Sequence, residues 1–360
     1  MKPLGIYIHV PFCAKKCPYC DFYSCSYNKS EAEDYAEAVI KHIESFESAD
    51  VDTIYFGGGT PSLIPPEFIE KILNAVGRKF NLKDDTEITL EVNPCTVNKE
   101  KLSHYKVMGI NRLSIGVQSL DNSELLFLGR NHTAQKAKEI ICLAYDLGFE
   151  NISADLMTGI PAQTTESMFN SIDKLSELPL VHISNYILKI EENTPFNNSR
   201  IINEMPDDDI VSDMYLNMVE RLSKNGFKQY EISNFSKEGF ESRHNLKYWN
   251  CEEYLGFGPM AHSFYDGKRY FNAETLDRYI ISPFEKTITD NNPGEDDEKI
   301  MLGLRLAKGI KLSDFPVRKD YILKKANLLK ESGLICFDGE NLALTPKGFL
   351  LSNSVISELI

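Results

Sequence analysis

The feature that most constrains the fold is a regular alternation of short apolar runs and longer amphipathic stretches over residues 4–235. The apolar runs are rich in β-branched and aromatic residues, and a turn signal follows each one, which is typical of buried strands. We therefore expect strands at residues 4–10, 53–56, 87–91, 112–117, 152–157 and 182–188. The amphipathic stretches predict helices at 31–47, 66–79, 99–107, 134–147, 166–176 and 207–225.

Repeated βα units predict an α/β fold with a parallel sheet and helices outside it. Six units favour an open, partial (βα)₆ TIM-like barrel, in which the chemistry lies at the carboxyl ends of the strands. Polar or glycine-rich motifs do follow the predicted strands. They are the cysteine-rich loop after Val10 and the segments 57–61, 93–94, 118–119 and 159–161.

The pattern changes after residue 235. Residues 1–235 are assigned to the barrel core, and 236–285 to an aromatic-rich, irregular connecting segment. Residues 286–360 resemble a small winged-helix-like α+β domain, with a helix at 321–332 and a hairpin at 334–337 and 342–344. This last segment has 11 Lys and Arg against 11 Asp and Glu, so a lid or docking role is favoured over DNA binding.

Composition narrows the class of protein. The net charge of −14 over 360 residues argues against a general nucleic-acid binder. No apolar run is long enough for a transmembrane helix, and the N-terminal apolar run is too short for a signal peptide. Eight cysteines without a secretory signal indicate thiols in a reducing compartment. We therefore expect a cytoplasmic protein.

Three of the cysteines lie within eight residues. Cys13, Cys17 and Cys20 have the spacing C-x₃-C-x₂-C, which suits an iron–sulfur cluster held by thiolates. Three thiolates leave one iron of a [4Fe–4S] cubane open to a chelator such as S-adenosylmethionine (SAM). A zinc site with Cys25 or His9 as fourth ligand is the alternative, although the spacing is unusual for zinc.

The motif and several others together resemble one family. The matching segments are YIHVPFCAKKCPYCDF at 7–22, YFGGGTPS at 55–62, EVNP at 91–94, RLSIGVQS at 112–119, LGRNH at 128–132 and DLMTGIP at 155–161. The chain resembles the radical-SAM family of oxygen-independent coproporphyrinogen III oxidase-like proteins over nearly its whole length. The resemblance implies a radical-SAM barrel with a [4Fe–4S] cluster on Cys13, Cys17 and Cys20, and bound SAM.

The resemblance also implies which residues bind SAM. They are Tyr7, the strand-end loop residues Gly57, Gly58, Gly59 and Thr60, and the polar residues Glu91, Gln118, Arg130 and Asp155. Their residue types fit these roles, because glycines let the backbone approach a ligand and a guanidinium binds a carboxylate with two parallel hydrogen bonds. Structural ion pairs or caps are the alternative for the polar residues.

Two departures favour the HemW-type haem chaperones within this family. The oxidases have a further cysteine where this chain has Phe22, and they have a long N-terminal arm. The segments YEISNF at 230–235, RHNLKYW at 243–249 and YLGFGPMAH at 254–262 are also similar to the chaperones. The resemblance implies haem binding near His244, with His262 as the alternative ligand and Tyr248 and Trp249 as stacking residues.

Three functions are weighed on this basis. The favoured one is a haem chaperone that binds haem, the cluster and SAM, and delivers haem to acceptor haemoproteins, including membrane-bound respiratory enzymes. The second is a coproporphyrinogen III oxidase, and the third a radical-SAM enzyme that modifies RNA, which the acidic composition disfavours. The residues do not decide whether SAM is cleaved, and they leave a homodimer open.

Overall fold

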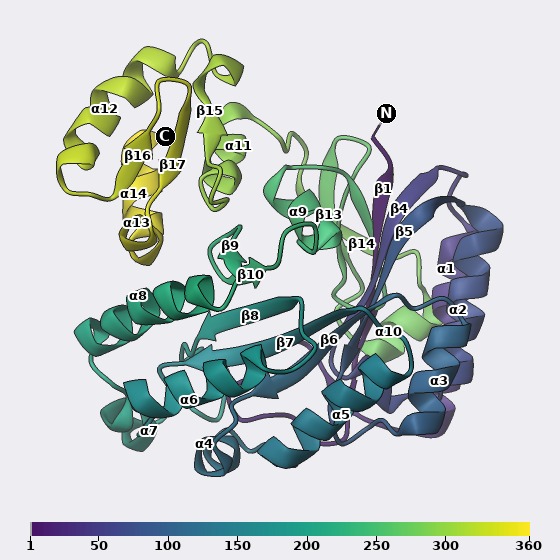
Figure 1. Cartoon of the computed structure of the whole chain (residues 1–360). Coiled ribbons are helices and arrows are strands. Elements are labelled where there is room, and N and C mark those ends of the chain that lie inside the picture. Colours follow the sequence, from purple (N-terminus) through teal and green to yellow (C-terminus); the bar gives the residue numbers. More distant parts are fainter. Residues whose placement is uncertain (1) are drawn as a thin grey trace.

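A computed structural model describes residues 2–360. It has one large mixed sheet with helices outside it and a small module at the C-terminal end (Figure 1). The large sheet has 12 strands, which are, in sheet order, β14 (Lys286–Asp290), β13 (Lys268–Asn272), β12 (His262–Tyr265), β11 (Tyr254–Phe257), β1 (Leu4–Val10), β4 (Asp50–Gly58), β5 (Asn81–Val92), β6 (Arg112–Gln118), β7 (Asn151–Thr158), β8 (His182–Ile187), β10 (Asn234–Ser236) and β9 (Lys228–Gln229).

The six strands β1, β4, β5, β6, β7 and β8 are parallel neighbours in this order. They are the six predicted strands, and the partial (βα)₆ barrel with a small C-terminal domain is confirmed. The main difference in length is β5, which begins at Asn81 rather than at residue 87. Its first five residues are polar or exposed, so no apolar run marks them.

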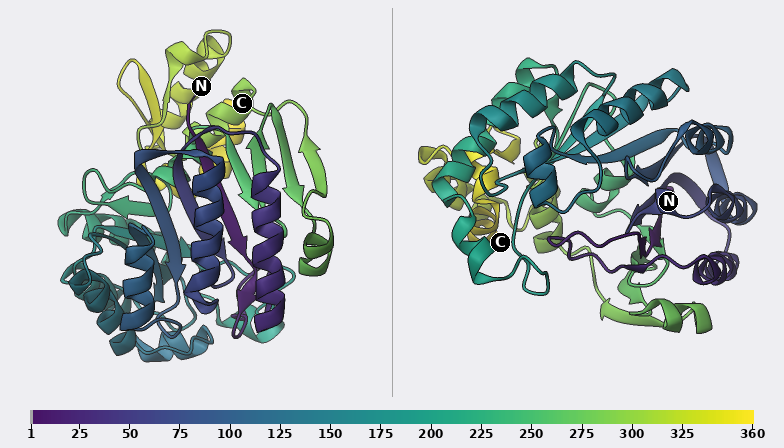
Figure 2. Two further views of the ribbon diagram at one scale, coloured as in Figure 1. Left: turned by 90° about the vertical axis from the view of Figure 1, so that its right-hand side faces the viewer. Right: turned by 90° about the horizontal axis from the view of Figure 1, so that it is seen from below.

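Helices cover the outer face of the barrel, as the view from below shows (Figure 2). The main ones are α1 (Lys29–Glu44), α2 (Pro66–Lys79), α3 (Lys99–Val107), α5 (Ala134–Asp146), α6 (Thr165–Ser176) and α8 (Asp208–Lys224). Side-chain caps fix several of their starts, for example Asn98 on α3 and Thr133 on α5. Buried aliphatic side chains of α1 and α2 pack together against the sheet and form part of the main core.

Four short helices and two short strands complete the barrel: α4 (Asn122–Phe127), α7 (Ser199–Glu204), α9 (Arg243–Trp249), α10 (Leu276–Ile281), β2 (Phe12–Cys13) and β3 (Cys25–Ser26). The prediction of an irregular segment after residue 235 is wrong in its secondary structure. β11 pairs in parallel with β1, and β12 to β14 extend the sheet beyond it. These strands are short and interrupted by turns, and their partner β1 lies about 250 residues away in sequence, so periodicity did not show them.

The C-terminal module has a three-stranded sheet with helices around it. Its elements are α11 (Asp296–Gly303), β15 (Ile310–Lys311), α12 (Lys319–Glu331), β16 (Ile335–Phe337), β17 (Asn341–Leu344), α13 (Pro346–Leu350) and α14 (Ser352–Leu359). Because β14 lies in the large sheet, that sheet continues past residue 285, and the three-part domain division stays a prediction. Among the described residues, no helix combines the length and apolar character needed to cross a membrane.

Candidate functional site

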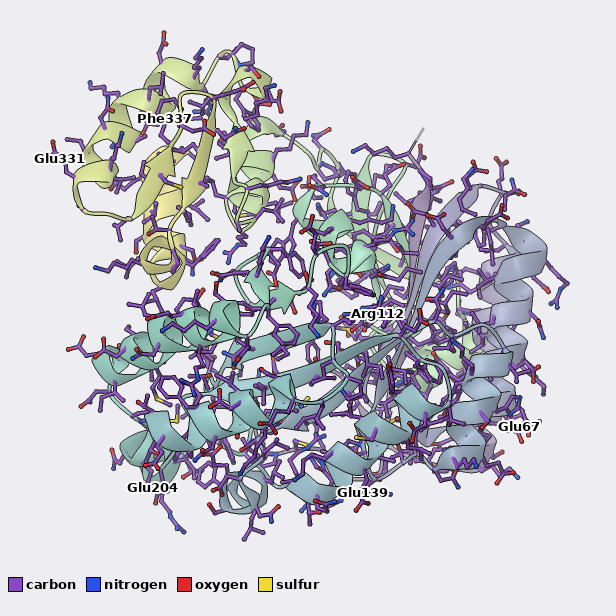
Figure 3. The ribbon with its side chains drawn as sticks, viewed as in Figure 1. Glu67, Arg112, Glu139, Glu204, Glu331 and Phe337 are labelled. Atoms are coloured by element: carbon purple, nitrogen blue, oxygen red, sulfur yellow. The ribbon has the colours of Figure 1, made fainter. Side chains whose placement is uncertain are left out.

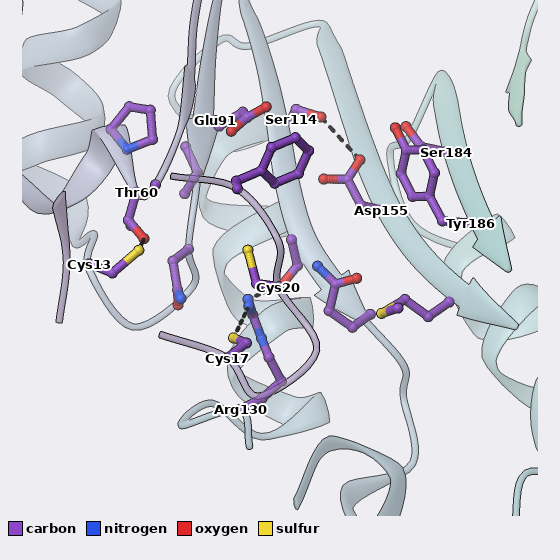
Figure 4. Close-up of a pocket in the computed structure, with 18 of the residues that line it drawn as sticks. Cys13, Cys17, Cys20, Thr60, Glu91, Ser114, Arg130, Asp155, Ser184 and Tyr186 are labelled. Atoms are coloured by element: carbon purple, nitrogen blue, oxygen red, sulfur yellow. Dashed lines mark hydrogen bonds between the residues drawn. The ribbon is translucent and has the colours of Figure 1, made fainter. Parts of the chain in front are cut away.

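A cavity of about 390 Å³ opens at the carboxyl ends of the parallel strands (Figure 4). Nine of the predicted site residues line it. They are Cys13, Cys17, Cys20, Gly59, Thr60, Glu91, Gln118, Arg130 and Asp155. The structure therefore brings the cysteine loop together with polar residues from four different strand ends. This is the end of a βα barrel at which ligands are expected.

The cysteine loop lies over the mouth of this cavity. The Cys13 sulfur is 3.6 Å from the Thr60 hydroxyl, and an Arg130 Nη1 atom lies 3.5 Å from the Cys17 sulfur. The amide of Cys20 donates to the carbonyl of Cys17 at 3.1 Å, which folds the loop back on itself. Burial raises the pKa of the Cys20 thiol, because the thiolate is less well solvated there than in water.

The donor set fits an iron–sulfur cluster. No three His, Cys, Asp or Glu side chains within residues 2–360 converge closely enough to ligate a single metal ion. A cubane takes each thiolate at a different iron, so three thiols that surround a common space are suitable ligands. A tetrahedral zinc ion would require them to meet at one point, together with a fourth ligand.

The glycine loop follows β4 and borders the thiols. The Gly59 amide donates to the carbonyl of Val10 at 2.8 Å, and a Cβ at Gly59 would come within 2.8 Å of the Phe12 carbonyl oxygen. Gly58 has φ +104°, a conformation that only glycine adopts readily. Its amide donates to Glu91 Oε2 at 3.2 Å. A Cβ at Gly57 would come within 3.0 Å of Glu91 Oε1, so Gly57 and Gly58 both border Glu91, whereas Gly59 and Thr60 line the cavity.

Two carboxylates lie in the cavity wall. Glu91 accepts a hydrogen bond from the Tyr55 hydroxyl at 2.9 Å, and Asp155 accepts one from Ser114 at 3.1 Å. Burial, with a contribution from Asp155, raises the pKa of Glu91 to about 7. Burial also raises the pKa of Asp155. Both groups are thus placed to accept hydrogen bonds from a polar or cationic ligand that restores their charge.

Gln118 and Arg130 complete the mouth. Gln118 is not a glycine but has φ +68°, at an irregularity in the pairing of β6 with β7. Backbone strain of this kind occurs at ligand sites, where it redirects a side chain. Arg130 donates from Nη2 to the carbonyl of Gly116 at 2.9 Å, and its Nε atom has no hydrogen-bond partner within residues 2–360.

Sequence reasoning missed the deeper lining of the cavity. It includes Tyr55, Arg112, Ser114, Ser184, Tyr186 and Asn245. The signal was present in β6, where polar or small residues alternate with Leu113, Ile115 and Val117, which are fully buried. In a barrel the apolar positions face the helices, so the polar positions of the same strand must face the interior.

His244 lies at the opposite end of the barrel from the thiols. It is on α9, which closes the amino ends of the strands near Gly5. Its side chain is buried, with Nδ1 2.9 Å from the Thr53 hydroxyl and Nε2 2.8 Å from the Tyr248 hydroxyl. Burial lowers the pKa of His244 to about 3. Both ring nitrogens have partners in this conformation, and haem ligation by His244 stays a prediction.

Other predicted residues also lie outside the cavity. The Tyr7 hydroxyl is 3.0 Å from His9 Nδ1, on the strand that carries the cysteine loop. The Tyr248 ring packs edge-on against Tyr254 at 4.6 Å. The side chain of His262 is exposed, and its ring lies 5.5 Å from that of Phe271. None of these three residues is brought to the thiols.

Comparison with known proteins agrees with the geometry. The family described as the Radical SAM superfamily matches residues 7–175, and the HemN C-terminal domain matches residues 297–351. A relative described as "Heme chaperone HemW" from Lactococcus lactis is 34% identical over 100% of this chain and 98% of its own length. The relative of the same description from Bacillus subtilis is 34% identical over 98% of each chain.

This chain belongs to the HemW family. Membership of this radical-SAM family implies a [4Fe–4S] cluster and SAM, and the family name implies haem. The crystallised coproporphyrinogen III oxidase HemN from Escherichia coli superposes with a TM-score of 0.84, over 99% of this chain and 90% of that one. Its sequence identity is 22%, so it shows that the fold is shared. The fold and family expectations from the sequence are therefore confirmed.

Proposed function

We propose that the protein is a haem chaperone that holds a [4Fe–4S] cluster and SAM at the barrel mouth and delivers haem to acceptor haemoproteins. Cys13, Cys17 and Cys20 would hold the cluster, while Gly59, Thr60, Glu91, Gln118, Arg130 and Asp155 would bind SAM. When bound, these two groups can supply one-electron chemistry. The chain's own residues orient SAM beside the thiols and exclude water from them.

One observation supports the chaperone over an oxidase. Phe22 occupies the position where the related oxidases have a further cysteine, and it lines the cavity with its side chain 68% exposed. An aromatic ring at the mouth of a cavity can pack against a flat, apolar macrocycle. In this proposal Phe22 stacks against haem at the mouth.

The alternative haem site is at His244. Ligation there requires the imidazole to give up its hydrogen bond to Thr53 or to Tyr248. Phe22 lies at the mouth of the cavity, and Asn245, which follows His244 on α9, lines the same cavity, so the two haem sites lie toward its two ends. The variants Phe22→Ala and His244→Ala therefore separate them.

The test is an anaerobic absorbance titration of haem into the reconstituted protein, with decarboxylation of coproporphyrinogen III assayed in parallel. We expect saturable haem binding that weakens in Phe22→Ala, and no decarboxylation. His104→Ala is the control, because this histidine lies at the surface beside Glu70. Decarboxylation without haem binding would overturn the proposal. If haem binding weakens only in His244→Ala, the haem site is at His244 rather than at Phe22.

A further inference from the structure

Arg112 is the least expected residue of the cavity. It begins β6 and lines the deep part of the cavity, and its residue surface is 1% exposed. Figure 3 shows it within the barrel, whereas the labelled acidic residues lie toward the outside. Removing a guanidinium from water is costly, so buried arginines are normally paired with an anion or fully hydrogen-bonded.

Within residues 2–360, at least one donor of the Arg112 guanidinium has no partner. Its Nε atom is buried without a hydrogen-bond partner among residues 2–360. The two nearby carboxylates take their hydrogen bonds elsewhere, Glu91 from Tyr55 and Gly58, and Asp155 from Ser114. They experience the charge of Arg112 through space. Arg130, in contrast, donates to Gly116 and contacts the Cys17 sulfur.

We propose that Arg112 binds a carboxylate group of the ligand that enters this cavity. A guanidinium presents donors in a planar fork that matches a carboxylate, and burial strengthens the contact. Glu91 and Asp155 in the same wall disfavour a doubly charged phosphate more than a singly charged carboxylate. The inference deepens the proposed function, in which there are two sources of the group: the carboxylate of SAM and a propionate of haem.

The experiment compares each ligand with an analogue that lacks the carboxylate. Dissociation constants of SAM, decarboxylated SAM, haem and haem dimethyl ester are measured on the cluster-loaded wild type, Arg112→Gln and Arg112→Lys. We expect Arg112→Gln to weaken either SAM or haem at least about tenfold, because a hydrogen bond to a charged group is lost. The matching carboxylate-free analogue should bind the wild type and the variant equally. Arg112→Lys keeps the charge without the fork, so its loss should be smaller.

The ligand that loses affinity in Arg112→Gln while its carboxylate-free analogue does not is the source of the carboxylate. An equal loss for a ligand and its analogue, or no loss for either ligand, overturns the inference. Arg200→Gln is the matched control, because Arg200 is an exposed arginine paired with Glu204. Bound iron and circular dichroism report whether each variant is folded; if Arg112→Gln is not, Arg112→Lys carries the comparison. A wild type that binds neither ligand would instead refute the proposed function.

Discussion

At the residue scale, buried histidines make the folding stability of this protein sensitive to acid. The His42 Nδ1 atom lies 3.0 Å from the Tyr279 hydroxyl, among the rings of Phe46, Phe257 and Phe284. Burial, with a smaller contribution from Lys286, lowers the pKa of His42 to about 4. The unfolded chain binds this proton near pH 6.5 and the folded chain only near pH 4. The stability linked to His42 is therefore complete above pH 6.5 and is lost as the pH falls toward 4.

We expect His42→Gln, which keeps a polar side chain, to remove this part of the acid sensitivity. Between pH 7 and 4.5 the wild-type free energy of unfolding should fall by about 2–3 kcal/mol more than that of the variant. Urea denaturation at a series of pH values measures the difference. His104→Gln, at the surface, should follow the wild type. Parallel pH profiles for wild type and His42→Gln would contradict the assignment.

At the residue scale, the sequence predicted best where chemistry and spacing coincide. Cys13, Cys17 and Cys20 were recognisable because three thiols in eight residues have few structural uses, and Gly58 because its turn follows a strand. Arg112 was missed because an arginine in an apolar strand could equally have been an edge residue facing water. Only the closure of the barrel shows that this side of β6 faces the cavity.

At the scale of elements, α9 illustrates what a local pattern leaves open. The sequence marks residues 243–249 as distinctive but does not say which end of the barrel they cover. In the structure Lys247 anchors α9 to Asp52 at 2.8 Å and to the carbonyl of Pro3 at 2.9 Å. These contacts join segments about 200 residues apart or more, so neither periodicity nor propensity could predict them.

A carboxylate on a neighbouring strand binds the start of α9, in addition to the side-chain cap from Ser242. Glu87 on β5 accepts hydrogen bonds from the amides of Arg243 and His244 at 3.1 and 3.0 Å. We expect Glu87→Ala to lower the free energy of unfolding by about 2 kcal/mol, because one buried and one partly buried amide lose their acceptor. Glu100→Ala, at the exposed first turn of α3, is the control for removing a carboxylate. Thermal or urea denaturation measures both, and equal stabilities would show that Glu87 does not hold α9 in place.

At the scale of the whole molecule, the cluster should depend on the thiols of the mouth and on no other described cysteine. We expect Cys17→Ser to lose most of its bound iron and sulfide after reconstitution while it stays folded. Cys142→Ser is the matched control, since Cys142 is exposed on α5. Iron and sulfide analysis of both purified variants measures the outcome. Wild-type iron in Cys17→Ser would exclude this residue as a ligand.

The barrel could be predicted as a whole, because repeated βα units have few compact arrangements. The position of the haem site could not be predicted. By residue type, Phe22 and His244 could both contact haem. Only the fold shows that Phe22 lies at the mouth and His244 toward the other end of the barrel, which makes them alternative haem sites. The cluster and haem are therefore linked in this account through the mouth. Loss of the cluster should impair the release of haem, as well as the one-electron chemistry of the cluster and SAM.

The most direct test of the chaperone is transfer of haem to an apo-haemoprotein. Haem-loaded wild type, Cys17→Ser and Cys142→Ser are mixed anaerobically with an apo-acceptor in the presence of SAM, and the acceptor's haem absorbance is followed with time. We predict transfer from the wild type and from Cys142→Ser, and transfer at least about tenfold slower from Cys17→Ser. If the wild type retains its haem, or never binds it and decarboxylates coproporphyrinogen III instead, the account is contradicted.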